Sequence, residues 1–263
     1  MDTAYLVTLF LLGFFGGTLS GLLGIGGGIV MFPLLLYFPS LLGFTALSIK
    51  AAAAITSMQS FFGAVSGAIA HHRYRRVNMQ LAYYFGGSMC ITSLAGSILS
   101  KFIAEQVILL VFSLMAIVAA YMMLRPIKKS SEEDIEDEVN ELIFNHLSAI
   151  FWGAGLGLLS GIIGQGGAFI FIPVMLYVLK VPTRITIGTA LIIGIASSSA
   201  VLLGRISTLQ IPYVFALTTV IGAVIGAQIG AKISQHVPKH RLRQILTVII
   251  VITAVKMIVD ALG

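Results

Sequence analysis

The stretch GTLSGLLGIGGGIVMFPLLLYF at residues 17–38 decides the fold, because the chain repeats it at residues 157–178 as GLLSGIIGQGGAFIFIPVMLYV. Ten of the 22 aligned positions are identical, and six of those ten are glycines or prolines. Both residue types disfavour the interior of a helix, yet the sequence around them is strongly apolar. The repeat therefore predicts a helix break at the same place in two equivalent apolar segments.

Composition indicates which class of protein contains these segments. Of the 263 residues, 58% are hydrophobic and 10% are charged, whereas a soluble domain is typically about 25% charged. Most of the nearly charge-free blocks reach the ~20 residues that a helix needs to cross a ~30 Å hydrocarbon layer. A soluble fold cannot bury so many, so the sequence predicts an all-α polytopic membrane protein. The blocks cover residues 4–38, 46–70, 79–99, 104–124, 147–179, 185–204, 211–231 and 244–259.

One polar segment divides the chain into two related halves. Residues 125–146 hold seven of the ten acidic residues, and a solvated connector explains them better than a regulatory loop does. We therefore expect a first transmembrane repeat over 1–124, a charged cytoplasmic linker over 125–146 and a second transmembrane repeat over 147–263. Within the linker, a short surface helix fits residues 132–144.

Loop charge predicts how the two halves are oriented. The basic loops are HHRYRR (71–76) and RPIKK (125–129) in the first half, and KVPTR (180–184) and KISQHVPKHRLR (232–243) in the second. Basic loops tend to face the cytoplasm, and these occupy complementary positions in the two halves. This pattern predicts inverted repeats, a common architecture of transporters.

Inversion requires an odd number of membrane crossings in each half. Blocks 4–38 and 147–179 must then be hairpins that turn near their glycines, which gives five helices per half and ten in total. Both chain termini and the loop 39–44 would lie outside the cell. Hairpins that cross the membrane fully and re-entrant hairpins fit the pattern equally well.

The glycine clusters GIGGG (24–28) and GQGGA (164–168) suggest a binding site. If new helices begin at Gly28 and Ala168, the amides at each start are free donors with a partial positive charge, which suits an anion. Unpaired amides are costly in hydrocarbon, so such breaks are expected where they line a cavity. We therefore predict that two groups of residues share one midplane anion site: Gly26, Gly27 and Gly28, and Gly166, Gly167 and Ala168.

Close helix packing is the alternative explanation for these glycines. Small residues let membrane helices approach each other, and the GxxxG-type spacing of the earlier glycines fits that role. A nucleotide loop is excluded, because the stretch has neither GxGxxG nor GK[ST] spacing. We assign to packing Gly17, Gly21 and Gly24, and the equivalent Gly157, Gly161 and Gly164.

These motifs together resemble a known family. The copies LSGLLGIGGG and LSGIIGQGGA, followed by PLLLYF and PVMLYV, with TIGTALIIGIASSS and GAIAHHR, are similar to the TauE/SafE sulfite exporter family of anion transporters. The resemblance covers essentially the whole chain and implies secondary transport of a small sulfur-containing anion, such as sulfite or a sulfonate. Two differences between the halves make the predicted pocket asymmetric. The second glycine cluster has Gln165 where the first has Ile25, and the first half has LSIKAAAAITS where the second has TIGTALIIGIASSS.

The inventory of charged residues agrees with an anionic substrate. Outside the linker the acidic residues are Asp2, Glu105 and Asp260, so no carboxylate lies deep in a span. This disfavours a cation site or a carboxylate proton relay. We expect no metal, no cofactor and no catalytic residues, because paired deep carboxylates, histidine clusters and nucleophile triads are not evident in the sequence.

Several polar side chains are candidate substrate ligands. Ser57 and Gln59 lie at a depth similar to that of Ser197 and Ser198, and Gln165 adds a neutral donor at the second break. Lys50, about two turns into its span, is either an anion lure or a snorkelling lysine. Proton coupling would suit the loop-edge pair His71 and His72, although a structural role is favoured for them.

Two further cations have simpler explanations. Arg205 closes a span and is expected to snorkel towards the interface. Lys256 precedes Asp260 by four residues, which predicts an ion pair on a helix surface.

The sequence thus predicts an alternating-access transporter in the prokaryotic inner membrane. Its partners would be a small anion, the lipid bilayer and protons as coupling ion, with no nucleic acid. An anion channel that uses the same amides is the main alternative, and a membrane enzyme or assembly factor is disfavoured. The exact substrate, the direction of transport and the oligomeric state stay open.

Overall fold

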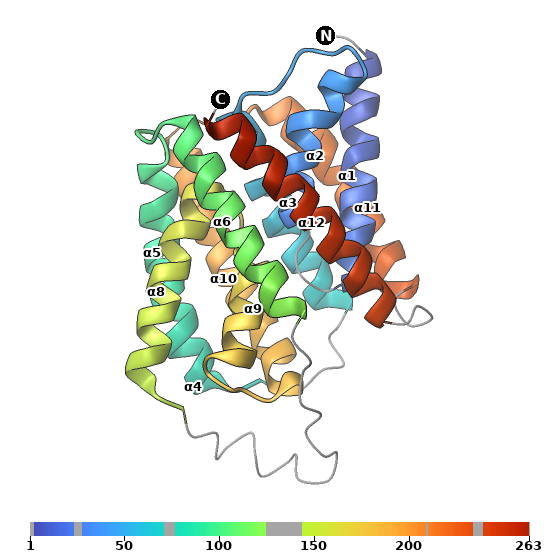
Figure 1. Cartoon of the computed structure of the whole chain (residues 1–263). Helices are drawn as coiled ribbons and strands as arrows, with labels where there is room; N and C mark the ends of the chain where they lie inside the picture. The colour runs from blue at the N-terminus through green and yellow to red at the C-terminus, as the bar shows by residue number, and fades with distance from the viewer. Residues whose placement is uncertain are drawn as a thin grey trace.

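The computed structural model describes residues 3–23, 28–70, 77–124, 144–208, 210–233 and 239–262. These ranges form a bundle of ten helices if the segment α4–η1–α5 is counted as one, as predicted (Figure 1). The first half comprises α1 (Thr3–Leu23), α2 (Gly28–Leu41), α3 (Ile49–Ala70), α4 (Met79–Leu81), the π-helical turn η1 (Ala82–Gly86), α5 (Gly87–Leu99) and α6 (Glu105–Leu124). The second half comprises α8 (His146–Ile163), α9 (Ala168–Tyr177), α10 (Thr183–Ser207), α11 (Tyr213–Ile233) and α12 (Lys239–Leu262).

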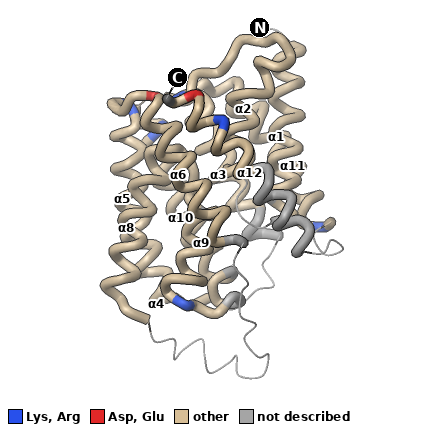
Figure 2. The backbone as a smooth tube through the Cα atoms, viewed as in Figure 1, with Lys and Arg blue, Asp and Glu red and all other residues tan. Residues whose placement is uncertain are grey.

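The described helices have the lengths and composition of a membrane protein. Among the described residues, the lysines, arginines, aspartates and glutamates lie at or near the ends of helices or in loops (Figure 2). By contrast, the ten residues of α9 span only about 15 Å, half the hydrocarbon thickness. Helix α9 alone is therefore too short to cross a bilayer. Within the described ranges, four helical stretches are long and apolar enough to cross a bilayer: Glu105–Met122, His146–Ile163, Gly188–Ser207 and Tyr213–Ile233.

The two halves pack against each other in a reciprocal way. Helix α1 lies along α11, and its equivalent α8 lies along α5. At the centre α3 packs on α10, and at the outside α6 packs on α12. Helices α1 and α8 begin at opposite ends of the bundle (Figure 1). This arrangement agrees with inverted repeats, while the side of the membrane on which each end lies stays a prediction.

Glycine faces let the paired helices touch through their backbones. A Cβ added to Gly17 or Gly21 on α1 would lie 2.1 Å from a carbonyl oxygen of α11. On α8, a Cβ at Gly157 or Gly161 would lie 2.4 or 2.3 Å from a carbonyl oxygen of α5. The packing role predicted for these four glycines is confirmed, and Gly24 lies outside the described residues.

Other predictions at the helix ends have mixed outcomes. The predicted ion pair is present, with Lys256 Nζ 3.2 Å from Asp260 Oδ2, and the same ammonium lies 4.4 Å from the ring centroid of Tyr37. Lys50 does not lie two turns into its span, because α3 begins at Ile49. Three predictions concern residues outside the described ranges: His71, His72 and nearly all of the linker helix at 132–144.

Candidate functional site

The second glycine break is a tight turn over residues 164–167, which we call the α8–α9 turn. Helix α8 ends in a Schellman motif, in which the Gly164 amide donates to Gly161 O at 3.2 Å and the Gln165 amide to Ser160 O at 3.0 Å. Gly164 and Gly167 have φ of 88° and 71°, which strongly favour glycine. Gly164, predicted to serve packing alone, therefore also ends the helix.

Helices begin on the far side of both breaks, where the sequence predicted them. Helix α9 starts at Ala168 and α2 starts at Gly28. Within the described residues, the amides of Gly167, Ala168 and Phe169 have no hydrogen-bond acceptor. They carry the partial positive charge of a helix N-terminus. Gly26 and Gly27, the other predicted ligands at the first break, lie outside the described residues.

Gln165 brings the two breaks together. A Cβ added to Gly28, the first residue of α2, would lie 3.0 Å from Gln165 Oε1 and 3.1 Å from its Cδ. The Gln165 side chain is only 1% exposed, and within the described chain neither its Nε2 nor its Oε1 has a hydrogen-bond partner. Each unpaired buried polar group costs about 1–3 kcal/mol. This carboxamide is therefore available to bind a polar molecule beside the start of α2.

The predicted serines of α10 support the turn. Ser197 Oγ donates to Gly166 O at 2.9 Å, and Ser198 Oγ donates to Gly194 O at 2.5 Å. A Cβ on Gly166 would lie 3.0 Å from Ser198 Cβ. The structure thus brings Ser197, Ser198 and Gly166 together. Their contacts fix the path of the turn, because both hydroxyl protons point to backbone carbonyls.

The three candidate ligands predicted on α3 do not lie together. Ser57 Oγ donates to Ala54 O within its own helix at 2.7 Å. Gln59 is 2% exposed and faces the α1–α2 hairpin, where its Nε2 would lie 3.7 Å from a Cβ at Gly16. Lys50 does not join the site, because its Nζ donates to Lys101 O, just beyond α5, at 2.8 Å.

Arg205 is a part of this region for which the sequence suggested another role. It does not snorkel: the side chain is fully buried. Its Nη2 donates to Ile162 O at 2.8 Å, and its Nη1 donates to the side-chain oxygen of Gln210. The guanidinium lies directly behind the α8–α9 turn, because a Cβ on Gly164 would lie 3.1 Å from Nη2. A cation here compensates the negative end of the α8 dipole.

The buried side-chain polar atoms that lack partners in the described residues belong to three side chains. In the described part of the chain, four buried side-chain atoms have no hydrogen-bond partner: Gln59 Oε1, Gln165 Nε2, Gln165 Oε1 and Arg205 Nε. Buried polar groups in proteins are rarely unpaired, so a cluster of them is unusual. Two of these residues, Gln165 and Arg205, lie at the α8–α9 turn, and Gln59 faces the α1–α2 hairpin.

Two further residues contact the turn and were missed by sequence reasoning. A Cβ on Gly167 would lie 2.7 Å from Met89 Cε and 2.9 Å from Ser160 Cβ. Ser160 had a detectable signal, because the repeat carries the equivalent Ser20 in the same LSG triplet. No pattern in the sequence marks Met89, because its position depends on how α5 packs on α8.

Comparison with known proteins gives consistent results. The family model described as sulfite exporter TauE/SafE matches residues 9–257. The probable membrane transporter protein YunE of Bacillus subtilis is 24% identical over 82% of this chain and 84% of its own length. A probable membrane transporter protein of Xylella fastidiosa is 30% identical over 67% of this chain and 64% of its own length. No solved structure matches the chain significantly.

Proposed function

Because the chain belongs to the TauE/SafE sulfite exporter family, we propose that it is a secondary transporter for a small sulfur-containing anion. Its relatives are named as membrane transporters, and membership of the family makes this chain a membrane transporter too. Sulfite and sulfonates are the proposed substrates, and protons are the proposed coupling ion.

The observation that carries the proposal is the position of Gln165. Its buried and unpartnered carboxamide lies against Gly28, at the start of α2, and belongs to the turn that leads into α9. An anion bound there would meet the Gln165 amide and the free backbone amides of both helix starts. The groups in direct contact with the anion would be neutral, which favours its release.

The burial of the site favours a carrier over the alternative anion channel. Of the predicted ligands whose exposure the structure describes, all except Lys50 are buried. An open channel keeps its ion sites on a water-filled path, whereas a carrier passes through a state closed on both sides. We therefore propose that movement of one repeat against the other opens the site alternately to each side.

Transport by purified protein in liposomes tests this function. The wild-type protein is expected to take up radiolabelled sulfite with saturable kinetics and to show counterflow when unlabelled sulfite is inside. Uptake that rises linearly with concentration would instead support the channel. The absence of uptake or binding for sulfite, thiosulfate and taurine alike would overturn the proposal. Imposing a pH gradient in the same vesicles tests proton coupling.

A Gln165→Leu variant tests the site itself. It removes both unpartnered polar atoms, and a hydrogen bond to a charged group contributes about 1.5–3 kcal/mol, so the KM for sulfite is expected to rise about 10- to 100-fold. Gln106→Leu is the matched control, because Gln106 is exposed on α6. Equal KM values for the two variants would show that Gln165 does not bind the anion.

A further inference from the structure

Arg205 is a buried cation that has no counter-ion among the residues that the structure describes. Its side chain is fully buried, and its two described partners, Ile162 O and Gln210 Oε1, are neutral oxygens. The carboxylates in the described part of the chain are both engaged elsewhere. Glu105 accepts a hydrogen bond from the Ile49 amide at 3.1 Å, and Asp260 pairs with Lys256.

An uncompensated charge in this place needs an explanation. Burying a charged group costs several kcal/mol even after the protein relaxes. The C-terminal end of α8, which Arg205 caps, offers only about half a negative charge. Positive charge therefore remains in the interior, beside the turn that carries Gln165. Ionisable residues inside membrane proteins commonly mark the path of a substrate or ion.

The geometry connects this charge to the site through a single turn. The guanidinium lies against Gly164 on one side of the turn, and the next residue, Gln165, extends to Gly28 on the other. We propose that Arg205 is a positioning residue that makes the site selective for anions: it supplies the fixed positive charge that the substrate neutralises, and it holds the end of α8. This inference rests on the function proposed above.

The other titratable side chains described near α10 do not neutralise Arg205. Lys50 donates to Lys101 O, and Cys90 Sγ donates to Ala196 O at 3.5 Å. Neither group is negatively charged, so neither neutralises Arg205. The described titratable side chains on the elements in contact with α10 or Arg205 are Lys50, Tyr83, Tyr84, Cys90, His146 and Tyr177.

Removal of the charge is the first test. Arg205→Gln in reconstituted liposomes is expected to raise the KM for methanesulfonate at least about 10-fold, because the attraction between a buried unit charge and an anion is only weakly screened inside a protein. Lys232→Gln is the control, since it removes the same charge at an exposed position at the end of α11. A KM within about twofold of the wild-type value in Arg205→Gln would overturn the inference.

A second variant keeps the test decisive if Arg205→Gln does not fold. Arg205→Lys retains a charge, but a buried lysine without a counter-ion loses its proton more readily than arginine does. Between about pH 7 and about pH 9.5 the ratio of its KM for methanesulfonate to that of the wild-type protein is expected to rise about 10-fold. The charge of methanesulfonate does not change in this range, so only the protein titrates.

The outcomes separate this inference from the proposed function. A KM ratio of Arg205→Lys to wild type that stays constant over this pH range would show that Arg205 merely caps α8. If the wild-type protein transports neither methanesulfonate nor sulfite, the proposed function itself is refuted, whatever the variants show. A wild-type protein that transports both, with variants that keep its KM, refutes the role of Arg205 alone.

Discussion

At the scale of single residues, the backbone of the α8–α9 turn limits what the chain can tolerate. Gly167 has a positive φ and is enclosed by Met89 and Ser160. A side chain at this position would be strained by its backbone and would also clash with α5 and α8. The orientation of the α9 amides therefore depends on one glycine.

Gly167→Val is expected to reduce sulfite uptake at least about 10-fold, because a β-branched residue at positive φ costs of the order of 1–2 kcal/mol or more and displaces the start of α9. Initial uptake rates in liposomes, normalised to inserted protein, measure this loss. Gly155→Val is the control, since a Cβ at that position of α8 meets nothing within 4 Å. Full activity of Gly167→Val would mean that the turn does not position a ligand.

Sequence reasoning at this scale succeeded for residues whose signal is local. The repeat alone located the helix starts at Gly28 and Ala168 and predicted the packing glycines on α1 and α8. It failed for Arg205, whose burial depends on the end of α8 and on Gln210. An arginine near the end of an apolar block looks the same in sequence whether it snorkels outward or caps a helix inside the protein.

At the scale of elements, apolar length predicted the helices but not their irregularities. Residues 79–99 read as one uniform span, yet the structure contains a π-helical turn at Ala82–Gly86. The neighbouring helices explain why it was missed. A Cβ on Gly86 would lie 3.0 Å from Ile193 of α10, and Phe85 O would lie 2.5 Å from a Cβ at Gly153 of α8. Such contacts arise only when helices from both halves have assembled, so no local pattern reports them.

The backbone contact between α1 and α11 predicts a loss of stability on a small substitution. A Cβ on Gly226 would lie 2.1 Å from Phe14 O, so Gly226→Ala must push the helices apart, at a cost of about 1–3 kcal/mol. Thermal unfolding in detergent is expected to show a melting temperature several degrees below that of the wild type. Gly87→Ala on α5 is the control, because a Cβ there has no close neighbour. Identical melting temperatures for the two variants would contradict the packing role.

At the scale of the whole molecule, the exchange of helix partners makes the two halves inseparable. The first helix of each half packs on the fourth helix of the other, and α3 packs on α10 between them. The candidate site therefore lies where the halves join, since Gln165 comes from one half and Gly28 from the other. Movement of one repeat against the other would change the distance between these two residues directly.

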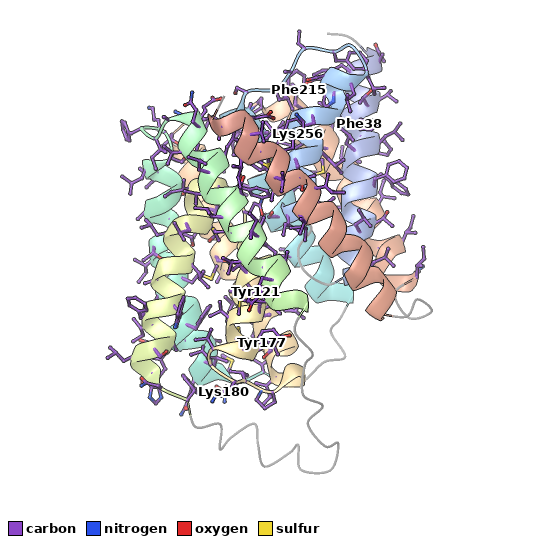
Figure 3. All side chains as sticks on the ribbon, viewed as in Figure 1. Phe38, Tyr121, Tyr177, Lys180, Phe215 and Lys256 are labelled. Carbon is purple, nitrogen blue, oxygen red and sulfur yellow. The ribbon has the colours of Figure 1, made fainter. Side chains whose placement is uncertain are left out.

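The inverted arrangement predicts opposite accessibility of two loops. Single cysteines replacing Leu42 and Lys180, in a Cys90→Ser background, are expected to lie on opposite sides of the membrane. Both positions are exposed, and Figure 3 shows Phe38, which is near Leu42 in the sequence, and Lys180 towards opposite ends of the bundle. An impermeant thiol reagent added to intact cells should label Leu42→Cys and not Lys180→Cys. Labelling of both or of neither would contradict the inverted topology.

The reciprocal packing of α1 and α11 also has a consequence for how the protein is made. The ribosome synthesises α1 first, whereas α11 emerges only near the end of translation. During that interval the glycine face of α1 borders lipid, which the membrane tolerates because acyl chains are as apolar as a neighbouring helix. The N-terminal half must therefore wait in the bilayer in an unfinished form. Its contacts with the second half, including the approach of Gln165 to Gly28, form only when the C-terminal half has been inserted.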